Sequence, residues 1–232
     1  MTIFPPLIKS STSTGDVCGA SLNYSLGIGP YMVIEPSLIA DLRPTQMTVG
    51  MREVHIKRRR LRENAAKTDR SHFSTRVVPV VLGPDSRRYL IDRHHFVRAV
   101  HDEGASEVPV TIIADLSALE SDAFWTELDH RGWMHPFDDA GRWHAYNEIP
   151  KSVCDLVDDP FRSLAGALRR MGGYTKIKSP FSEFRWANFL RHRIDRLTVE
   201  REFDRALDLA IKLAESRQAD RLPGWRRPQF VS

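Results

Sequence analysis

The chain has 232 residues, of which 41% are hydrophobic and 28% are charged, a composition typical of globular proteins. This length suffices for one domain with a large appendage or for two small domains, and the composition argues against a chain that is disordered throughout. The net charge of +4 is unevenly distributed. Basic residues outnumber acidic ones by 8 to 3 in residues 51–70 and by 16 to 8 in residues 161–232, whereas acidic residues dominate by 14 to 3 in residues 101–160. Such basic segments either meet phosphates or are simply solvated.

Cysteine usage and hydropathy exclude several classes of protein. Cys18 and Cys154 lie far apart and form no Cys-x-x-Cys pair, so neither a disulfide framework nor a structural zinc site is expected. The N-terminal sequence lacks a basic start followed by an apolar run, and no stretch approaches about 18 consecutive apolar residues. We therefore expect no signal peptide, no membrane partner and a cytoplasmic location.

Four segments are predicted, with an α+β fold overall. Residues 1–30 are rich in Ser, Thr, Gly and Pro, which predicts an irregular N-terminal arm. Residues 31–116 predict a small mixed sheet with helices. Residues 117–218 predict a mainly α-helical C-terminal extension, and residues 219–232 a tail.

A basic helix and a β-hairpin are expected early in the ordered part. Residues 49–67 are good helix formers with few apolar anchors, which predicts a mostly exposed helix. The β-branched residues 77–82 predict a strand, Gly-Pro-Asp-Ser at 83–86 predicts a turn, and residues 89–91 predict the partner strand. Pro79 indicates either an edge position or a bulge in the first strand.

The pattern changes abruptly after residue 91. Residues 92–101 predict a helix, which Gly104 terminates. Residues 108–114 are again β-branched and predict a further strand. Residues 77–115 thus give strand, turn, strand, helix and strand.

Helices are expected to dominate the remainder. Ser117 and Glu120 have the spacing of a capping box. Asp159-Pro160 and Ser179-Pro180 each place a capping residue before a Pro at the first helical position. Apolar residues follow both at helical spacing, and a last amphipathic helix is expected over residues 198–217.

Aromatic residues are spread through this helical part, and we interpret them as core rather than as a platform for stacking bases. They are Trp125, Trp133, Trp143, Phe181, Phe184 and Trp186. The polar and aromatic segment at residues 130–136 is a candidate lining of a substrate pocket.

Chemistry is expected where the strand at residues 89–91 gives way to a helix. The first N–H groups of a helix have no internal partners and the dipole is positive there, so this junction is a natural seat for a phosphate. His94, His95 and Arg98 would add side-chain donors. Asp92 adds a carboxylate that could hold magnesium or accept a proton.

Two other interpretations of the junction stay open on spacing alone. Asp92 would merely cap the helix in the first, and the histidines would be ordinary polar residues. A zinc site made of Asp92, His94 and His95 is the second. It is geometrically awkward, because adjacent residues on a helix point about 100° apart.

Several stretches, taken together, carry a resemblance. They are Leu42-Arg43-Pro44-Thr45-Gln46, the basic helix, residues 77–82, residues 89–100 with Asp92-Arg93-His94-His95-Phe96, and Val108-Pro109-Val110. Over about residues 32–116 the chain resembles the ParB/sulfiredoxin superfamily, and within it the branch of ParB-like nucleases. Asp159-Pro160-Phe161-Arg162-Ser163-Leu164-Ala165-Gly166 and Pro180-Phe181-Ser182-Glu183-Phe184 are similar to the helical extension of that branch. The resemblance implies a mixed sheet whose strand-to-helix loop binds nucleotide phosphates.

The loop at residue 92 is similar to the Asp-Gly-His-His-Arg loop of the free-serine kinases of this fold, more than to the Gly-Glu-Arg-Arg loop of ParB proteins. The resemblance implies that Asp92, His94 and His95 lie at the phosphates. We expect a nucleotide-binding set of Arg43, Gln46, Arg93, His94, His95 and Arg98, a metal ligand in Asp92, and catalytic candidates in Asp92, Glu53 and His95. Arg93 replaces the loop glycine, which weakens backbone approach to a phosphate or supplies a charge instead. Gln46 stands where the kinases have a catalytic Glu, and it cannot act as a base. Glu53 is either its substitute or a surface residue of the helix.

Three hypotheses follow. The leading one is an enzyme that binds ATP or another nucleoside triphosphate with Mg and transfers or hydrolyses a phosphoryl group, with an unknown small-molecule acceptor. The second is a ParB-like DNA-binding protein or nuclease, less favoured because no helix-turn-helix module is apparent; its basic contacts would be Lys57, Arg58, Arg59, Arg60 and Arg62. The third is a non-catalytic nucleotide-sensing switch. A homodimer is left open.

Overall fold

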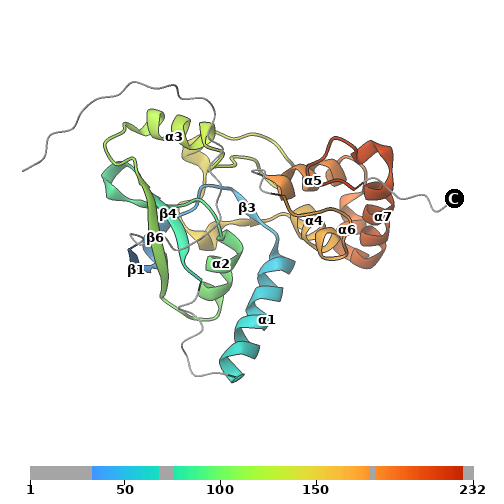
Figure 1. The fold of residues 1–232 in the computed structure, drawn as a ribbon, viewed down its shortest axis with the longest axis horizontal. Coiled ribbons are helices and arrows are strands. Elements are labelled where there is room, and N and C mark those ends of the chain that lie inside the picture. The colour runs from blue at the N-terminus through green and yellow to red at the C-terminus, as the bar shows by residue number, and fades with distance from the viewer. Residues whose placement is uncertain (1–32, 68–75, 178–180, 227–232) are drawn as a thin grey trace, which may run out of the picture.

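The computed structural model describes residues 33–67, 76–177 and 181–226. The predicted arm at residues 1–30, the predicted cap at Ser179 and the last six residues of the predicted tail lie outside the described residues. The strands and the first three helices form one half of the molecule, and the last four helices form the other (Figure 1).

A five-stranded mixed sheet with the strand order β1-β6-β4-β5-β2 forms the first half. Its strands are β1 (Ile34–Leu38), β2 (Leu42–Arg43), β4 (Val78–Leu82), β5 (Arg88–Leu90) and β6 (Glu107–Asp115). The long β6 pairs antiparallel with β1 and parallel with β4, and β4 and β5 form the antiparallel pair that the hairpin pattern predicted. Pro79 lies in an interior strand, and the irregularity it indicated is a register shift between Val80 and Val81.

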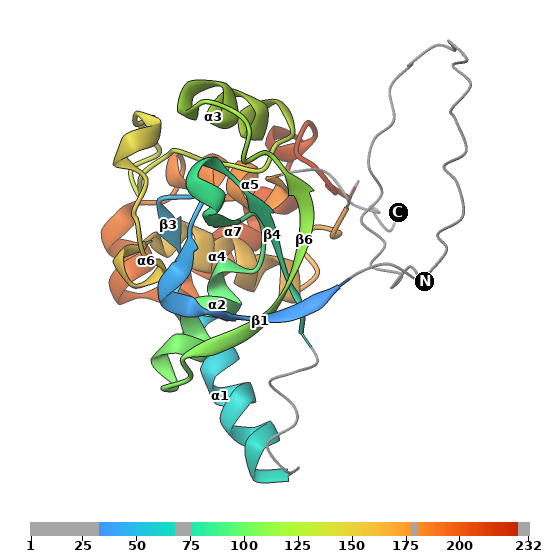
Figure 2. The same ribbon diagram turned by 90° about the vertical axis from the view of Figure 1, so that its left-hand side faces the viewer.

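Helices cover both faces of this sheet (Figure 2). Successive strand residues point to opposite faces, so Val80 and Val81 contribute to different cores. Val80 packs in a cluster with residues of α1 (Met51–Lys67) and α2 (His94–Asp102), whereas Val81 packs with residues of α3 (Ser121–His130). Helix α1 has one fully buried residue, Val54, which confirms the mostly exposed helix.

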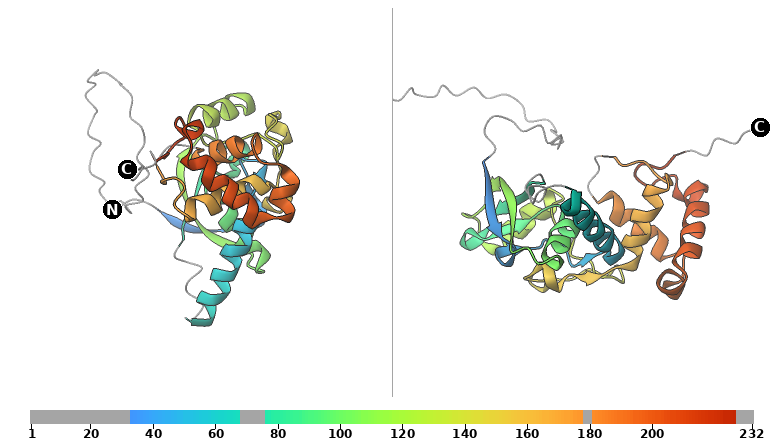
Figure 3. Two further views of the ribbon diagram at one scale, coloured as in Figure 1. Left: turned by 90° about the vertical axis from the view of Figure 1, so that its right-hand side faces the viewer. Right: turned by 90° about the horizontal axis from the view of Figure 1, so that it is seen from below.

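The second half contains α4 (Pro160–Arg170), α5 (Ser182–Arg191), α6 (Arg196–Arg201) and α7 (Phe203–Glu215), which pack around Trp186 and Tyr174 (Figure 3). Asp159 caps α4 by accepting the N–H of Phe161 at 3.0 Å, as the Asp-Pro pair predicted. The following segment also packs here, because the indole N–H of Trp225 donates to the carbonyl of Ala214 at 2.8 Å.

The two halves meet along a seam in which the parallel pair β3 (Thr48–Val49) and β7 (Val157–Asp158) is the central contact. Helix α1 packs against α4 beside this pair. A mixed sheet followed by a helical C-terminal part confirms the predicted α+β class. Among the described helices, none is both long and apolar enough to cross a membrane.

Three local predictions are wrong. Ser117 does not cap a helix, because its N–H and hydroxyl both bond to Oδ1 of Asp115 and α3 begins only at Ser121. The single helix expected over residues 198–217 is two helices, separated at Glu202, whose φ of −128° and ψ of 53° are not helical. Trp143 is not a core residue, since it is 58% exposed.

Candidate functional site

The junction between β5 and α2 is open at Asp92. This residue is exposed, and its Oδ1 accepts the backbone N–H of Arg93 at 2.6 Å. Arg93 directly precedes α2 in the left-handed conformation, with φ 67° and ψ 22°. Glycine adopts this conformation without strain and other residues do not. The resemblance implies a glycine at this position, and the left-handed backbone explains why glycine suits it. Arg93 adopts the same conformation with backbone strain.

His94 and His95 hold the loop between β2 and α1. Nε2 of His94 accepts the N–H of Thr45 at 3.2 Å, and Nε2 of His95 accepts the N–H of Gly50 at 3.0 Å. An Nε2 atom that accepts a hydrogen bond carries no proton, so each neutral ring must carry its proton on Nδ1. Both imidazoles therefore remain able to donate from Nδ1. His94 is buried, whereas part of His95 stays accessible.

Both rings are neutral at physiological pH. Burial, and the nearby charge of Arg162, lower the pKa of His94 to about 3. Burial lowers the pKa of His95 well below its usual value, and the charges of Arg162 and Lys57 act in the same direction. With Nε2 occupied and the pKa depressed, neither imidazole is suited to act as a general base.

Arg162 of α4 is 4% exposed, and its charge acts on both histidines. Its NH1 donates to the carbonyl of Thr48 at 2.6 Å, and its guanidinium carbon lies 3.7 Å from the centre of the Phe184 ring. Its Nε is buried and has no hydrogen-bond partner. Burial lowers the pKa of Arg162 to about 10, so the guanidinium keeps its charge at neutral pH.

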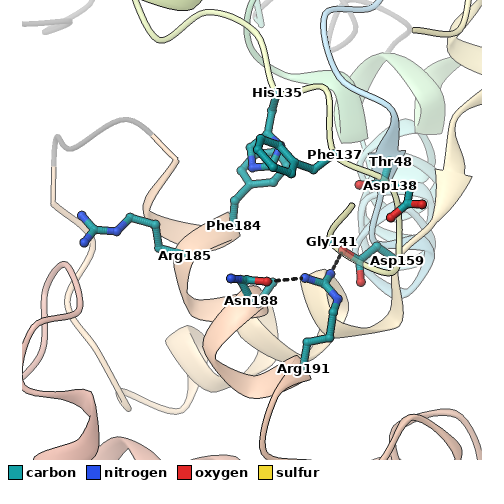
Figure 4. Close-up of a pocket in the computed structure, with 11 residues that line it drawn as sticks. Thr48, His135, Phe137, Asp138, Gly141, Asp159, Phe184, Arg185, Asn188 and Arg191 are labelled. Carbon is teal, nitrogen blue, oxygen red and sulfur yellow. Dashed lines mark hydrogen bonds and ion pairs between the residues drawn. The ribbon is translucent and has the colours of Figure 1, made fainter. Parts of the chain in front are cut away.

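A cavity of about 170 Å³ opens next to this arginine, where β3, α4, α5 and the segment after α3 converge (Figure 4). His135 stacks on Phe184 with ring centres 3.8 Å apart, and Phe137 lies at the edge of the His135 ring. On the opposite wall, NH2 of Arg191 bonds to Oδ2 of Asp159 at 2.5 Å. His135 belongs to the segment proposed as a pocket lining, and it does line this cavity.

The structure brings part of the predicted site together. Asp92, Arg93, His94 and His95 are consecutive at the junction, and the Gln46 side chain is buried in the loop they contact, where it donates to the carbonyl of Thr48 at 2.8 Å.

The other predicted side chains have separate partners. Arg43 donates to the carbonyl of Lys151 at 2.5 Å. Arg98 bonds to Asp102 of its own helix and to backbone carbonyls of the segment before β7. Glu53 forms an ion pair with Arg170 of α4. Its carboxylate is therefore engaged in joining α1 to α4.

The basic run of α1 is largely neutralised within the chain. Arg58 and Arg62 both bond to Glu103 at 2.6 Å, and Arg59 lies 3.7 Å from Glu63. Most of these cations are therefore not unpaired charges offered to nucleic acid.

Among the residues that the structure describes, no three or more His, Cys, Asp or Glu side chains gather as a metal cage. A Mg²⁺ ion usually binds one or two carboxylates and completes its octahedron with phosphate oxygens and water. Asp92 fits that role, because it is exposed and the backbone N–H of Arg93 engages its Oδ1, which leaves Oδ2 for a metal ion. A zinc site of Asp92, His94 and His95 does not fit, since both Nε2 atoms are occupied.

Sequence reasoning missed Arg162, which lies at the centre of these contacts. Its stretch Asp159-Pro160-Phe161-Arg162 was interpreted as a helix start and as part of a family resemblance, with no role given to Arg162. In the structure residues 160–168 of α4 are all buried and Arg162 is the charged residue among them, a burial that the apolar spacing in the sequence does not reveal. A cation on the buried face of a helix requires a partner or a function.

Comparison with known proteins gives a family match and a solved relative. A sequence model of the family described as "Putative ParB-like nuclease" matches residues 36–192. The crystal structure of protein Atu1540 from Agrobacterium tumefaciens is similar, with 49% sequence identity and a TM-score of 0.79. The match covers 85% of this chain and 100% of that one.

A second solved structure is similar only weakly. It is the C-terminally truncated chromosome-partitioning protein ParB from Caulobacter crescentus, complexed with CTP-γ-S, with 12% identity and a TM-score of 0.30 over 80% of this chain and 93% of that one. Among curated proteins, no sequence matches this chain.

Proposed function

Because the chain belongs to the family of ParB-like nuclease domains in the ParB/sulfiredoxin superfamily, we propose that it binds a nucleoside triphosphate, with the phosphates between the N-terminus of α2 and the facing sides of α1 and α4. The finer proposal is Mg-dependent phosphoryl transfer or hydrolysis, with a small-molecule acceptor in the neighbouring cavity.

The observation that carries this proposal is an excess of positive charge where α1, α2 and α4 meet. Burial lowers the pKa of Lys57, and three neighbouring cations lower it further: Arg76, Arg60 and Arg169. The carboxylate that opposes this shift, Glu53, is bonded to Arg170, and Arg169 itself pairs with Glu183. A triphosphate supplies several negative charges, and neutralising them is the main task of a phosphoryl-transfer site.

The residues at the junction would have defined roles. The first N–H groups of α2 and the Nδ1–H of His95 would donate to phosphate oxygens, and His94 would fix the loop through Thr45. Asp92 would hold Mg²⁺, which neutralises the charge that develops on the phosphates. Because Glu53 is engaged by Arg170, Asp92 would accept a proton in the alternative case in which it does not hold the metal.

Titration calorimetry with ATP, CTP and GTP, with and without Mg²⁺, tests the proposal. Lys57→Met should weaken binding by about tenfold, the loss expected for one charge-assisted phosphate contact. Arg59→Met on the same helix is the matched control, because the Arg59 side chain is 72% exposed and pairs with Glu63. No nucleotide binding by the wild type would end this reading. Binding without turnover would favour a nucleotide-sensing switch.

DNA binding or nuclease activity is the second candidate, and the family match favours it. It predicts binding to duplex DNA that falls steeply between about 50 and 200 mM salt. Because Arg58, Arg59 and Arg62 are engaged by carboxylates of the same chain, we expect this binding to be weaker than that of a nucleotide.

A further inference from the structure

Arg162 carries a buried charge that, among the described residues, no carboxylate bonds directly. Among the described residues, no carboxylate oxygen lies within the 4.0 Å of an ion pair to its guanidinium. Asp159, one turn earlier, is occupied elsewhere, since Oδ2 bonds to Arg191 and Oδ1 accepts the N–H of Phe161. Burying a cation without a bonded carboxylate costs free energy, and the contacts that Arg162 forms within the chain do not fully offset this cost.

Arg162 also forms fewer hydrogen bonds than the donors of its guanidinium allow. A guanidinium offers five N–H donors in a fixed fork, and Nε of Arg162 is buried without a partner. The NH1 contact with the carbonyl of Thr48 is to a neutral acceptor. A guanidinium fork matches the oxygens of a phosphate or carboxylate better than a single carbonyl, which makes this side chain well suited to receive an anion.

Three carboxylates, Asp159, Glu53 and Asp92, favour the charged form of Arg162 from a distance, but among the described residues none of them forms an ion pair with it. His94, His95 and His135 are close enough to feel the charge of Arg162, and burial keeps all three neutral by lowering their pKa values. The charge of Asp92, an exposed residue at the junction between β5 and α2, raises the pKa of Arg162.

The Phe184 ring holds the guanidinium of Arg162 in place. The guanidinium carbon of Arg162 and the ring centre of His135 lie 3.7 and 3.8 Å from the centre of the Phe184 ring. Two groups this close to one ring must occupy its opposite faces, so Phe184 is clamped between them. Phe184 and Thr48 also line the cavity (Figure 4), so Arg162 contacts two residues of the cavity wall.

We infer that Arg162 is a ligand-binding residue, and that its preorganised guanidinium takes a phosphate oxygen of the nucleotide at the boundary between the phosphate site and the cavity. This inference rests on the proposed function and deepens it. A charge held in place before the ligand arrives needs no reorganisation on binding, which is how such groups recognise anions.

The test compares two arginines of the same site. Arg162→Met removes the unpaired cation, whereas Arg191→Met breaks the ion pair with the buried Asp159. Arg162→Lys keeps a charge without the fork, and Arg205→Met on the exposed side of α7 controls for net charge. Each variant is measured for its melting temperature without ligand and, by calorimetry, for binding of sodium tripolyphosphate, ATP and CTP.

We expect Arg162→Met to lose at least about tenfold in affinity for tripolyphosphate and both nucleotides. Its unliganded melting temperature should fall much less than that of Arg191→Met, because an unpaired buried charge is removed rather than created. Arg162→Lys should fold normally and bind more weakly than the wild type, while Arg205→Met should bind as the wild type does.

The opposing outcomes are distinct. Wild-type affinity in Arg162→Met and Arg162→Lys, with nucleotide binding intact, would overturn the role of Arg162 and leave the proposed function standing. A melting temperature as low as that of Arg191→Met, with Arg162→Lys binding normally, would assign Arg162 a structural role and also overturn the inference. No binding of any probe by the wild type would overturn both.

Discussion

The adjacent histidines illustrate how a single residue can mislead when it is considered alone. Neighbouring residues on a helix point about 100° apart, which made a shared metal ion awkward. The same divergence lets His94 and His95 reach two separate N–H groups of one loop, those of Thr45 and Gly50. Their position at the N-terminal end of α2 allows this arrangement, and the proton on each Nδ1 follows from it.

The strain at Arg93 gives a prediction for a single residue. Arg93→Gly should raise the free energy of unfolding by up to about 1 kcal/mol relative to Arg93→Ala, because alanine keeps the left-handed strain and glycine removes it. Urea denaturation of the two variants isolates the contribution of backbone strain to the free energy of unfolding, since both lack the arginine side chain. A glycine variant less stable than the alanine variant would contradict the left-handed conformation at this position.

At the scale of elements, α4 connects the predicted helical extension to the site. Its cap, Asp159, is 2% exposed and also bonds to Arg191 of α5, so one carboxylate both begins a helix and fixes its neighbour. Helix α6 begins with the same residue type, because Asp195 accepts the N–H of Thr198 at 3.1 Å, but Asp195 is exposed. Comparing these two caps therefore separates the stability contributed by helix capping from the stability contributed by the buried ion pair.

Asp159→Ala should lower the free energy of unfolding by about 3–5 kcal/mol, since it leaves Arg191 buried without its partner. Asp195→Ala should cost only about 1 kcal/mol, the usual value of a lost exposed cap. Chemical denaturation followed by circular dichroism gives both values. Equal losses in the two variants would show that the Asp159–Arg191 pair adds nothing beyond the cap.

At the scale of the whole molecule, the site lies on the seam between the two halves. His94 and the loop at Thr45 come from the sheet half, Arg162 comes from the helical half, and His135 comes from the segment between α3 and β7. The halves approach closely, since a side chain added at Gly50 would place its Cβ 2.7 Å from the backbone N of Ser163 in α4. Neither half contains the complete site.

The free energy of unfolding at acidic pH should depend on the histidines that lie at this seam. The pKa values of His94 and His135 are about 3 in the folded protein, below the ordinary value of 6.5. Below pH 6.5 the unfolded chain therefore binds protons that the folded chain does not, and stability falls as the pH drops from about 6.5 toward 3. Each histidine should cost about 2 kcal/mol between pH 7 and pH 5.

Urea denaturation at pH 7 and pH 5 measures this loss. His94→Gln, whose amide oxygen can still accept the Thr45 N–H, should reduce the loss by about 2 kcal/mol. The substitution His130→Gln removes an exposed imidazole at the end of α3 and is the control. A wild-type stability that does not change between the two pH values would contradict the burial of these histidines in the neutral form.

Local patterns in the sequence were enough to predict the α+β class, the hairpin around residues 83–86, α2 and the Asp-Pro start of α4. Alternating apolar residues, turn residues and capping residues act over a few positions, so they can be interpreted without the fold. The strand-to-helix junction at Asp92 belongs to the same class of signal. The interruption at Glu202 was missed because apolar periodicity continues through it.

Tertiary structure alone decided which polar side chains act together. It paired Glu53 with Arg170 and Arg58 with Glu103, and it brought Arg162 close enough to lower the pKa of His94 although 68 positions separate them in the chain. The reason is physical: the partner of a charge, and the burial that sets its pKa, depend on contacts between distant segments, which no local pattern encodes.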